Sequence, residues 1–230
     1  MKKQKRFLLQ ENELPMQWYN IQADMKNKPL PPLNPATKEP LSAEDLAHIF
    51  SMECAKQELD SEHAWIDIPE EVQDKYKYYR STPLVRAYAL EQALNTPAHI
   101  YFKNESINPL GSHKINSALP QCYYCKQEGT TNVTTETGAG QWGAALSYAA
   151  SVFGLSAAVY QVKISMQQKP YRSLIMRTFG AEVTGSPSMS TRAGKDIITR
   201  DPMHPGSLGT AISEAVELAT TTPNCKYTLG

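Results

Sequence analysis

The sequence has no excess charge of either sign, no long apolar run and few cysteines. Among its 230 residues, 23 are Lys or Arg and 23 are Asp or Glu, so the formal net charge is zero. Such a balance provides no long-range field that would attract nucleic acid or an anionic membrane. No apolar run reaches the ~18 residues of a membrane span, and the start MKKQKRFLLQ turns polar too early for a signal peptide. We therefore expect a cytoplasmic protein with a small-molecule substrate and no affinity for nucleic acid or membrane.

The cysteines do not form a metal-binding pattern. Cys122 and Cys125 form the motif CYYC, but Cys54 and Cys225 do not make a second pair with the spacing of zinc ligands. A redox dithiol usually follows a strand and opens a helix, whereas CYYC falls inside the helix expected after Lys114. We interpret both cysteines of the motif as small, half-buried helix residues.

The first 80 residues differ in composition from the rest of the chain. They are rich in proline and charge, as in KPLPPLNPATKEP, and include short helical patches. One patch, SAEDLAHIFSMECAKQEL, opens with a capping signal formed by Ser42 and Asp45. With 41% hydrophobic residues, the whole chain can bury a sizeable core. We expect residues 1–80 to be an N-terminal extension that wraps around this core.

From about residue 98, short apolar runs alternate with amphipathic helices. HIYFK, NVTTE, AAVYQV and AEVTG have the composition of strands, and GQWGAALSYAASVFG and KPYRSLIMRTFG lie between the last three. The residues that recur at helical spacing are Trp142, Ala145, Leu146, Ala149 and Phe153 in the first helix and Tyr171, Leu174, Ile175 and Thr178 in the second. Strands that alternate with helices pair in parallel through right-handed crossovers. We therefore expect an α/β fold with an open parallel sheet flanked by helices.

The loop TGAGQWG follows the expected strand NVTTE, at the edge where an open parallel sheet binds its ligand. Its glycines, Gly138, Gly140 and Gly143, allow backbone N–H groups to converge on an anion at the start of the next helix. No acidic residue ends a second strand at the distance that a dinucleotide site requires. Glu136 stands directly before the loop and can either relay protons or cap the helix. Both roles remain open from the residues alone.

A single lysine stands out in the stretch NPLGSHKINSALPQ, where Lys114 lies close to His113 and Asn116 after a turn. A lysine at the start of a helix is commonly a solvated surface charge. The alternative is a covalent catalyst, because a lysine amine forms Schiff bases with carbonyl groups. Which role applies depends on the other groups near Lys114.

Four motifs at coherent spacing resemble those of one enzyme family. They are GSHKINSALPQ, TTETGAGQWGAAL, QKPYRSLIMRTFGAEV and HPGSLGTAISEAVE, accompanied by WYNI and STPLVRA nearer the N-terminus. Together they resemble the pyridoxal-phosphate-dependent tryptophan synthase beta chains, in particular a second, longer subgroup with an N-terminal extension. The resemblance extends from Trp18 to Gly230. It implies the fold-type II architecture of pyridoxal-phosphate enzymes.

The resemblance also implies a role for each motif residue. Lys114 would bind pyridoxal 5'-phosphate covalently and later carry a proton at the substrate α-carbon. His113 and Asn116 would contact the cofactor, His113 at its phosphate. Glu136 would assist loss of the serine hydroxyl and later proton transfer, and Trp142 stands where the more familiar subgroup has a histidine. The residues that would hold the substrate carboxylate are Thr137, Gly138, Ala139, Gly140 and Gln141.

The reaction implied by the resemblance joins L-serine and indole into L-tryptophan and water. Indole would be free or would come from indole-3-glycerol phosphate through an alpha chain, and the enzyme would be a homodimer. Two alternatives stay open. One is another fold-type II enzyme, such as a threonine synthase or a serine/threonine deaminase, and the other is an inactive fragment. Glu136 favours the tryptophan synthase over the related enzymes, which would lack an acidic residue at this point of the loop.

A division of the chain follows from the same resemblance. Residues 1–80 would form the extension and its helices, 81–112 would contribute to a larger cofactor domain, and 113–230 would form the N-terminal α/β domain with a mobile substrate-loop region. The family's glycine- and serine-rich cup for the cofactor phosphate, which lies in its second half, does not occur in this sequence. The final CKYTLG has the pattern of a strand that enters a sheet. We therefore expect the N-terminal fragment of a longer enzyme, incomplete at the C-terminus.

Overall fold

The computed structural model describes residues 4–230, which divide into two compact units. The first unit contains the chain up to Trp18 and Asp67–His113, and the second contains Tyr19–Ile66 and Lys114–Gly230. The three segments expected from the sequence remain a prediction about domain organisation.

The first unit is built on a small antiparallel sheet. Its strands are β1 (Arg6–Phe7), β4 (Leu84–Arg86) and β5 (Tyr101–Lys103), in the order β1-β4-β5. Its helices are α3 (Glu70–Lys77) and α4 (Tyr88–Ala93), with 3-10 turns η1 (Glu11–Glu13) and η3 (Glu105–Ile107). The strand expected at HIYFK is therefore confirmed as β5, but its partner is antiparallel and it takes no part in the parallel sheet.

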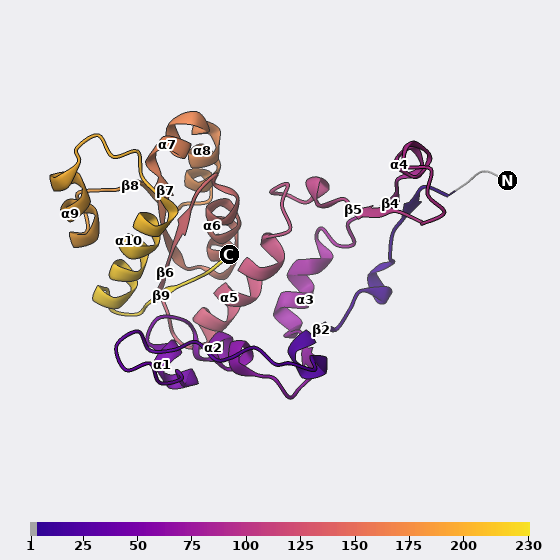
Figure 1. Cartoon of the computed structure of the whole chain (residues 1–230), viewed down its shortest axis with the longest axis horizontal. Helices are drawn as coiled ribbons and strands as arrows, with labels where there is room; N and C mark the ends of the chain where they lie inside the picture. Colours follow the sequence, from indigo (N-terminus) through magenta and orange to yellow (C-terminus); the bar gives the residue numbers. More distant parts are fainter. Residues whose placement is uncertain (1–3) are drawn as a thin grey trace. The chain divides into compact units, whose positions relative to one another are not determined.

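The second unit contains the expected parallel sheet (Figure 1). Its strands are β6 (Asn132–Thr137), β7 (Ser156–Val162), β8 (Glu182–Ser186) and β9 (Cys225–Tyr227), in the order β8-β7-β6-β9. All three pairings are parallel, which confirms the strands predicted at NVTTE, AAVYQV and AEVTG. The pattern of CKYTLG as a strand that enters a sheet is also confirmed.

Helices cover both faces of this sheet, as Figure 1 shows. They are α5 (Ile115–Gln127), α6 (Gln141–Phe153), α7 (Lys163–Gln168), α8 (Pro170–Thr178), α9 (Arg192–Arg200) and α10 (Leu208–Thr221). Helix α6 packs on β6 and β7 and is itself covered by α5 and α8, whereas α10 packs on the other face. The apolar positions predicted for α6 are all buried, so that prediction is confirmed.

The apolar face predicted for α8 is wrong. Tyr171 and Leu174 are 78% and 61% exposed, whereas the buried residues of this helix are Ser173 and Met176. The reason is the close approach of α8 to α6, where the Met176 sulfur fills the space beside Gly143. This contact between α8 and α6 includes Met176 but leaves the side chains of Tyr171 and Leu174 exposed.

The segment Tyr19–Ile66 of the second unit is mostly irregular. It contains η2 (Ile21–Asp24), α1 (Ala43–Ala47) and α2 (Met52–Leu59), and a two-stranded sheet joins β2 (Gln17–Tyr19) to β3 (Trp65–Asp67). Ser42 and Asp45 form the predicted capping box at the start of α1.

The cysteines of CYYC, Cys122 and Cys125, lie inside α5 and are buried. This position confirms their structural interpretation, although both are more buried than the half-buried state that we expected.

The strand order contains one reversal that determines where a ligand can bind. Strands β6, β7 and β8 follow one another in one direction, whereas β9 returns to the other side of β6. The chain after β6 enters α6, and the chain after β9 runs to the side of α5, where the backbone of Leu229 exchanges hydrogen bonds with the Gln121 side chain. In open α/β sheets such a switch point, at the carboxyl ends of the strands, is the usual place for a ligand.

Candidate active site

A cavity of about 140 Å³ lies at this switch point, and all its lining residues belong to the second unit. The lining residues are Lys114, Glu136, Thr137, Gly138, Ala139, Gln141, Trp142, Leu208 and Gly230. The cavity thus brings together the lysine, the carboxylate and most of the loop that were singled out in the sequence. Leu208, from the start of α10, and Gly230, beyond β9, have no local sequence signal and were not predicted.

The loop between β6 and α6 presents the positive end of a helix to the cavity. Its last residue, Gly140, has φ +94°, and a Cβ there would lie 2.6 Å from Cβ of Arg172, so only glycine fits. Gly140 is also the N-cap of α6 and has no side chain to cap the helix, whereas Oγ1 of Thr137 accepts a hydrogen bond from the Gly143 N–H at 3.2 Å. The other first-turn N–H groups and the helix dipole favour an anion at this end. Capping of α6 by Glu136, one of the two roles left open, is wrong.

Lys114 immediately precedes α5 and is half-buried. Its Nζ lies 6.0 Å from the centroid of the Trp142 ring. That ring is held in place, because Nε1 of Trp142 donates to Oγ1 of Thr135 at 2.6 Å and Oγ1 of Thr135 donates to the carbonyl of Thr228 at 2.7 Å. A rigid aromatic wall therefore stands beside the lysine amine.

Glu136 is the penultimate residue of β6 and is only 4% exposed. Its Oε2 accepts a hydrogen bond from the hydroxyl of Tyr227, on β9. Burial, followed by this hydrogen bond and the charge of Glu136, raises the pKa of Tyr227 well above its usual range. The tyrosine is therefore a stable donor to the carboxylate at any ordinary pH. Tyr227 was not singled out in the sequence, because nothing local to it indicates a partner so far away along the chain.

Three predicted site residues do not line the cavity. His113 is exposed in the turn before Lys114 and belongs to the first unit. Asn116 is half-buried in the first turn of α5, and Gly140 is buried beneath the loop beside Arg172. The roles expected for His113 and Asn116 toward a cofactor stay predictions.

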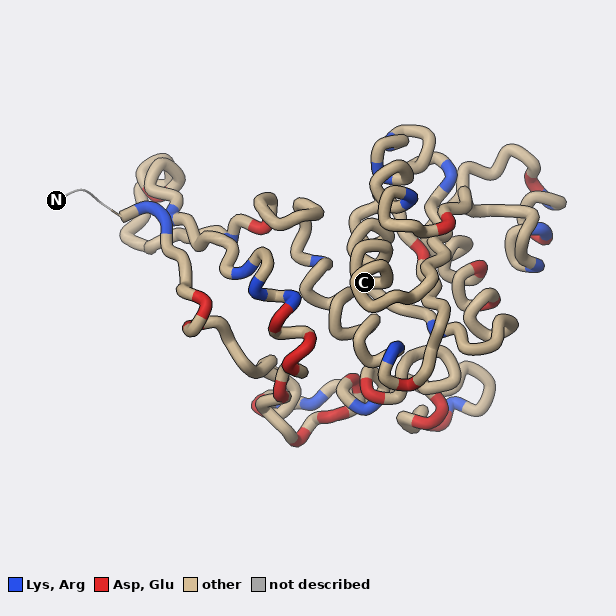
Figure 2. Tube along the Cα trace, turned by 180° about the vertical axis from the view of Figure 1, so that it is seen from behind, with Lys and Arg blue, Asp and Glu red and all other residues tan. Residues whose placement is uncertain are grey.

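The segment that follows β7 carries charge of only one sign. The segment from Lys163 to Ala181, which contains α7 and α8, carries four cations and no acid (Figure 2). They are Lys163, Lys169, Arg172 and Arg177. Because Arg172 packs against Gly140, this basic segment adjoins the substrate loop. Positive charge here supports binding of an anionic ligand.

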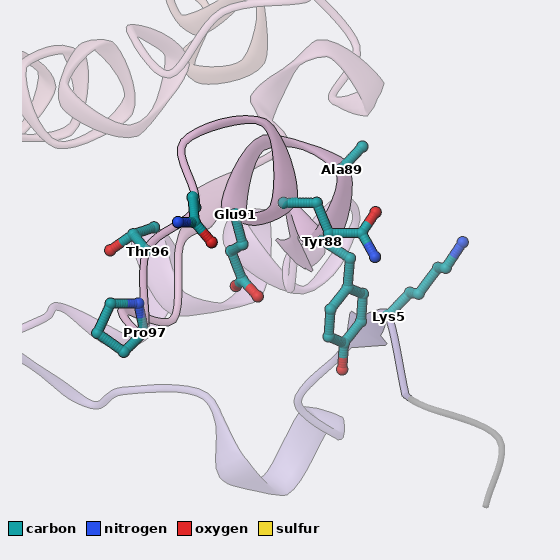
Figure 3. A pocket seen from close by; sticks show the side chains of 8 residues that line it. Lys5, Tyr88, Ala89, Glu91, Thr96 and Pro97 are labelled. Carbon is teal, nitrogen blue, oxygen red and sulfur yellow. The ribbon is translucent and has the colours of Figure 1, made fainter.

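A second cavity, of about 760 Å³, lies in the first unit and is lined by Tyr88, Glu91 and neighbouring residues (Figure 3). The carboxylate of Glu91 in this cavity already accepts hydrogen bonds from the protein. Glu91 accepts hydrogen bonds from the Arg86 guanidinium at 2.9 and 3.2 Å and from the Ile100 N–H at 2.8 Å. The Arg86 hydrogen bonds hold the pKa of Glu91 below its usual value. This cavity contains none of the predicted site residues, and its carboxylate serves the local structure.

Neither a metal-binding cluster nor a membrane-spanning helix is found among residues 4–230. No group of three or more His, Cys, Asp or Glu side chains in this range is arranged to hold a metal ion. No helix in the same range combines the length and apolar character needed to cross a membrane.

A parallel sheet with a lysine, a carboxylate and an anion-binding loop at its switch point is the arrangement of a cofactor-dependent α/β enzyme. Residues 76–228 match the sequence profile of the family described as "Pyridoxal-phosphate dependent enzyme", and the chain belongs to this family.

The chain is also similar to several proteins that are named as tryptophan synthase beta chains. The chain is 54% identical over 222 residues to the "Tryptophan synthase beta chain 2" of Thermotoga maritima, covering 96% of this chain and 52% of that protein. It is 51% identical over 226 residues to the protein of the same name from Aquifex aeolicus, covering 98% and 52%. It is 50% identical over 224 residues to the "Tryptophan synthase beta chain" of Thermococcus gammatolerans, covering 97% and 51%. The chain thus spans about half the length of the curated relatives it matches.

Proposed function

We propose that this protein is a pyridoxal-phosphate-dependent lyase of the tryptophan synthase beta type, which condenses L-serine with indole to L-tryptophan and water. The observation that carries the proposal is the buried, hydrogen-bonded Glu136 in the same cavity as Lys114. A threonine synthase or a serine/threonine deaminase would share the lysine and the loop but would lack this acid. The relatives' names support the same choice.

The residues around the cavity fit the proposed cofactor. The positive end of a helix, a basic segment and a half-buried amine suit an anionic aldehyde. When bound, pyridoxal phosphate supplies an electron-withdrawing ring that stabilises negative charge at the substrate α-carbon. We assign Lys114 to holding the cofactor, and His113 and Asn116 to further contacts with it.

Each remaining residue acts on the substrate. Lys114 moves the proton at the α-carbon, because it stands at the start of α5 and lines the cavity. Glu136 protonates the departing serine hydroxyl and takes up a proton as indole adds. The substrate carboxylate binds the loop Thr137–Gln141 at the positive end of α6. The Trp142 ring, which lines the cavity, favours an aromatic second substrate.

We also propose that the enzyme acts as a homodimer and that a tryptophan synthase alpha chain is the partner that supplies indole.

The cofactor attachment is tested with borohydride reduction of the purified protein after addition of pyridoxal phosphate. Peptide mass spectrometry should place the reduced cofactor on Lys114. Lys114→Ala should lose the adduct and remain folded, because the side chain is only half-buried. Lys126→Ala, in the last turn of the same helix, is the matched control and should keep it. Attachment to another lysine in the unmodified protein would contradict the assignment.

A further inference from the structure

Glu136 and Tyr227 form a buried pair between adjacent strands. Both side chains are 4% exposed, and the tyrosine hydroxyl donates to Oε2 of the carboxylate. Because Tyr227 engages Oε2, Oε1 is the oxygen that we assign to proton exchange in the cavity that Glu136 lines.

Tyr227 is itself held from three directions. It lies opposite Thr134 in the parallel pairing of β9 with β6. Its backbone N–H donates to the carbonyl of Ile49 at 2.9 Å, and its ring packs on Phe50 with centroids 5.6 Å apart. The ring also belongs to the apolar cluster beneath α10. A hydroxyl on so constrained a ring has one position, so it can orient its acceptor.

We propose that Tyr227 is a positioning residue that fixes the Glu136 carboxylate with Oε1 toward the reacting groups, an inference that rests on the function proposed above. A carboxylate on a flexible side chain has several rotamers, and only some of them meet the substrate. The hydrogen bond from Tyr227 selects one of them before the substrate arrives. It also satisfies one oxygen of a buried charge, which would otherwise be costly.

The alternative is that Tyr227 serves only to fill the core, and Tyr227→Phe separates the two. This change keeps the ring and removes the hydroxyl. Tyr160→Phe is the matched control, because Tyr160 is also 4% exposed and lies in the same cluster but does not line the cavity. If the role is positioning, Tyr227→Phe lowers kcat about 10- to 100-fold with little change in KM, the usual weight of a hydrogen bond to a charged group. Tyr160→Phe leaves kcat within about twofold.

A spectroscopic readout tests the contact independently of turnover. In protein labelled with ¹³C at the glutamate carboxyl carbon, the Glu136 resonance is identified by its loss in Glu136→Gln. It should move in Tyr227→Phe and stay in place in Tyr160→Phe. Conversely, the ¹³Cζ resonance of Tyr227 should move in Glu136→Gln, which tests the contact even if Tyr227→Phe does not fold.

The outcomes are distinct. An unmoved Glu136 resonance in Tyr227→Phe, an unmoved Tyr227 resonance in Glu136→Gln, or an unchanged kcat in Tyr227→Phe would each overturn the positioning role. Absence of tryptophan formation by the unmodified protein would instead refute the proposed function, and the two resonance tests would still decide whether Tyr227 orients Glu136.

Discussion

At the residue scale, the informative feature is a buried carboxylate at the wall of a cavity. Glu136 lines the cavity together with Lys114, and one of its oxygens accepts a hydrogen bond from Tyr227. Glu214 offers a structural contrast. It is fully buried, and one oxygen accepts hydrogen bonds from Ser188 and Thr191 that tie α10 to the loop after β8. One buried glutamate lines the cavity and the other is engaged in the fold.

Glu136→Gln should therefore lower turnover far more than it lowers stability. The amide keeps the size of the side chain but cannot exchange the proton, and a positioned acid or base commonly contributes about two to four orders of magnitude. We expect tryptophan formation from serine and indole to fall by that factor while cofactor attachment to Lys114 persists. Glu214→Gln should leave turnover per folded molecule within about twofold. Near-normal turnover in Glu136→Gln would assign the residue to a structural role.

At the element scale, the site depends on the close approach of α6 to its neighbours. A Cβ at Gly143 would lie 2.5 Å from the Met176 sulfur, 2.8 Å from Cγ1 of Val159 and 2.9 Å from Cγ2 of Thr137. These atoms belong to α8, β7 and β6. Gly143 thus allows α6 to bring its first turn to the carboxyl edge of the sheet, where the loop and Lys114 meet.

Gly143→Ala should destabilise the protein by about 1–3 kcal/mol, the usual cost of overpacking a core. Gly138→Ala is the matched control in the same loop, because the nearest atom to its Cβ would be Cδ1 of Leu208 at 4.0 Å. Denaturant unfolding monitored by circular dichroism measures both changes. Equal midpoints for the two variants would show that α6 can shift to accept a methyl group.

At the scale of the whole molecule, all four cysteines come together from α2, α5 and β9. The neighbouring thiols influence one another, but burial is the main cause of their shifts. Burial raises the pKa of Cys54 and of Cys225 to about 11 each, and it raises the pKa of Cys122 and Cys125 as well. The folded protein therefore keeps its thiols protonated at a pH at which the unfolded chain ionises them.

This difference predicts a loss of stability in alkali. Below the ordinary thiol pKa of 9.0 both states are protonated, and the full stability is present. As the pH rises from about 9 to about 11, the unfolded state releases protons that the folded state retains, so the free energy of unfolding falls. Denaturant unfolding under reducing conditions across this range should show the decline, and Cys54→Ala should make it less steep. An identical slope in the variant would exclude Cys54 as a cause.

The sequence by itself determined the parts of this protein that depend on local pattern. Short runs of strand-forming residues predicted β6, β7 and β8, and apolar residues at helical spacing predicted α6. Local sequence also predicted that Lys114 precedes a helix and that Glu136 stands at the end of a strand. The face of α8 was wrong because apolar spacing does not reveal how closely a neighbouring helix approaches.

Only the tertiary structure decided which distant groups meet these residues. β9 lies beside β6, so Tyr227 reaches Glu136 across 91 positions of the chain, and Leu208 and Gly230 complete the cavity. No local pattern in the sequence shows that β9 lies beside β6. The order of strands in the sheet results from the packing of α10 against one face and α6 against the other. Local sequence therefore places each reactive group at the end of its own element. The reversal of strand order then places the ends of β6, α5 and β9 around one cavity.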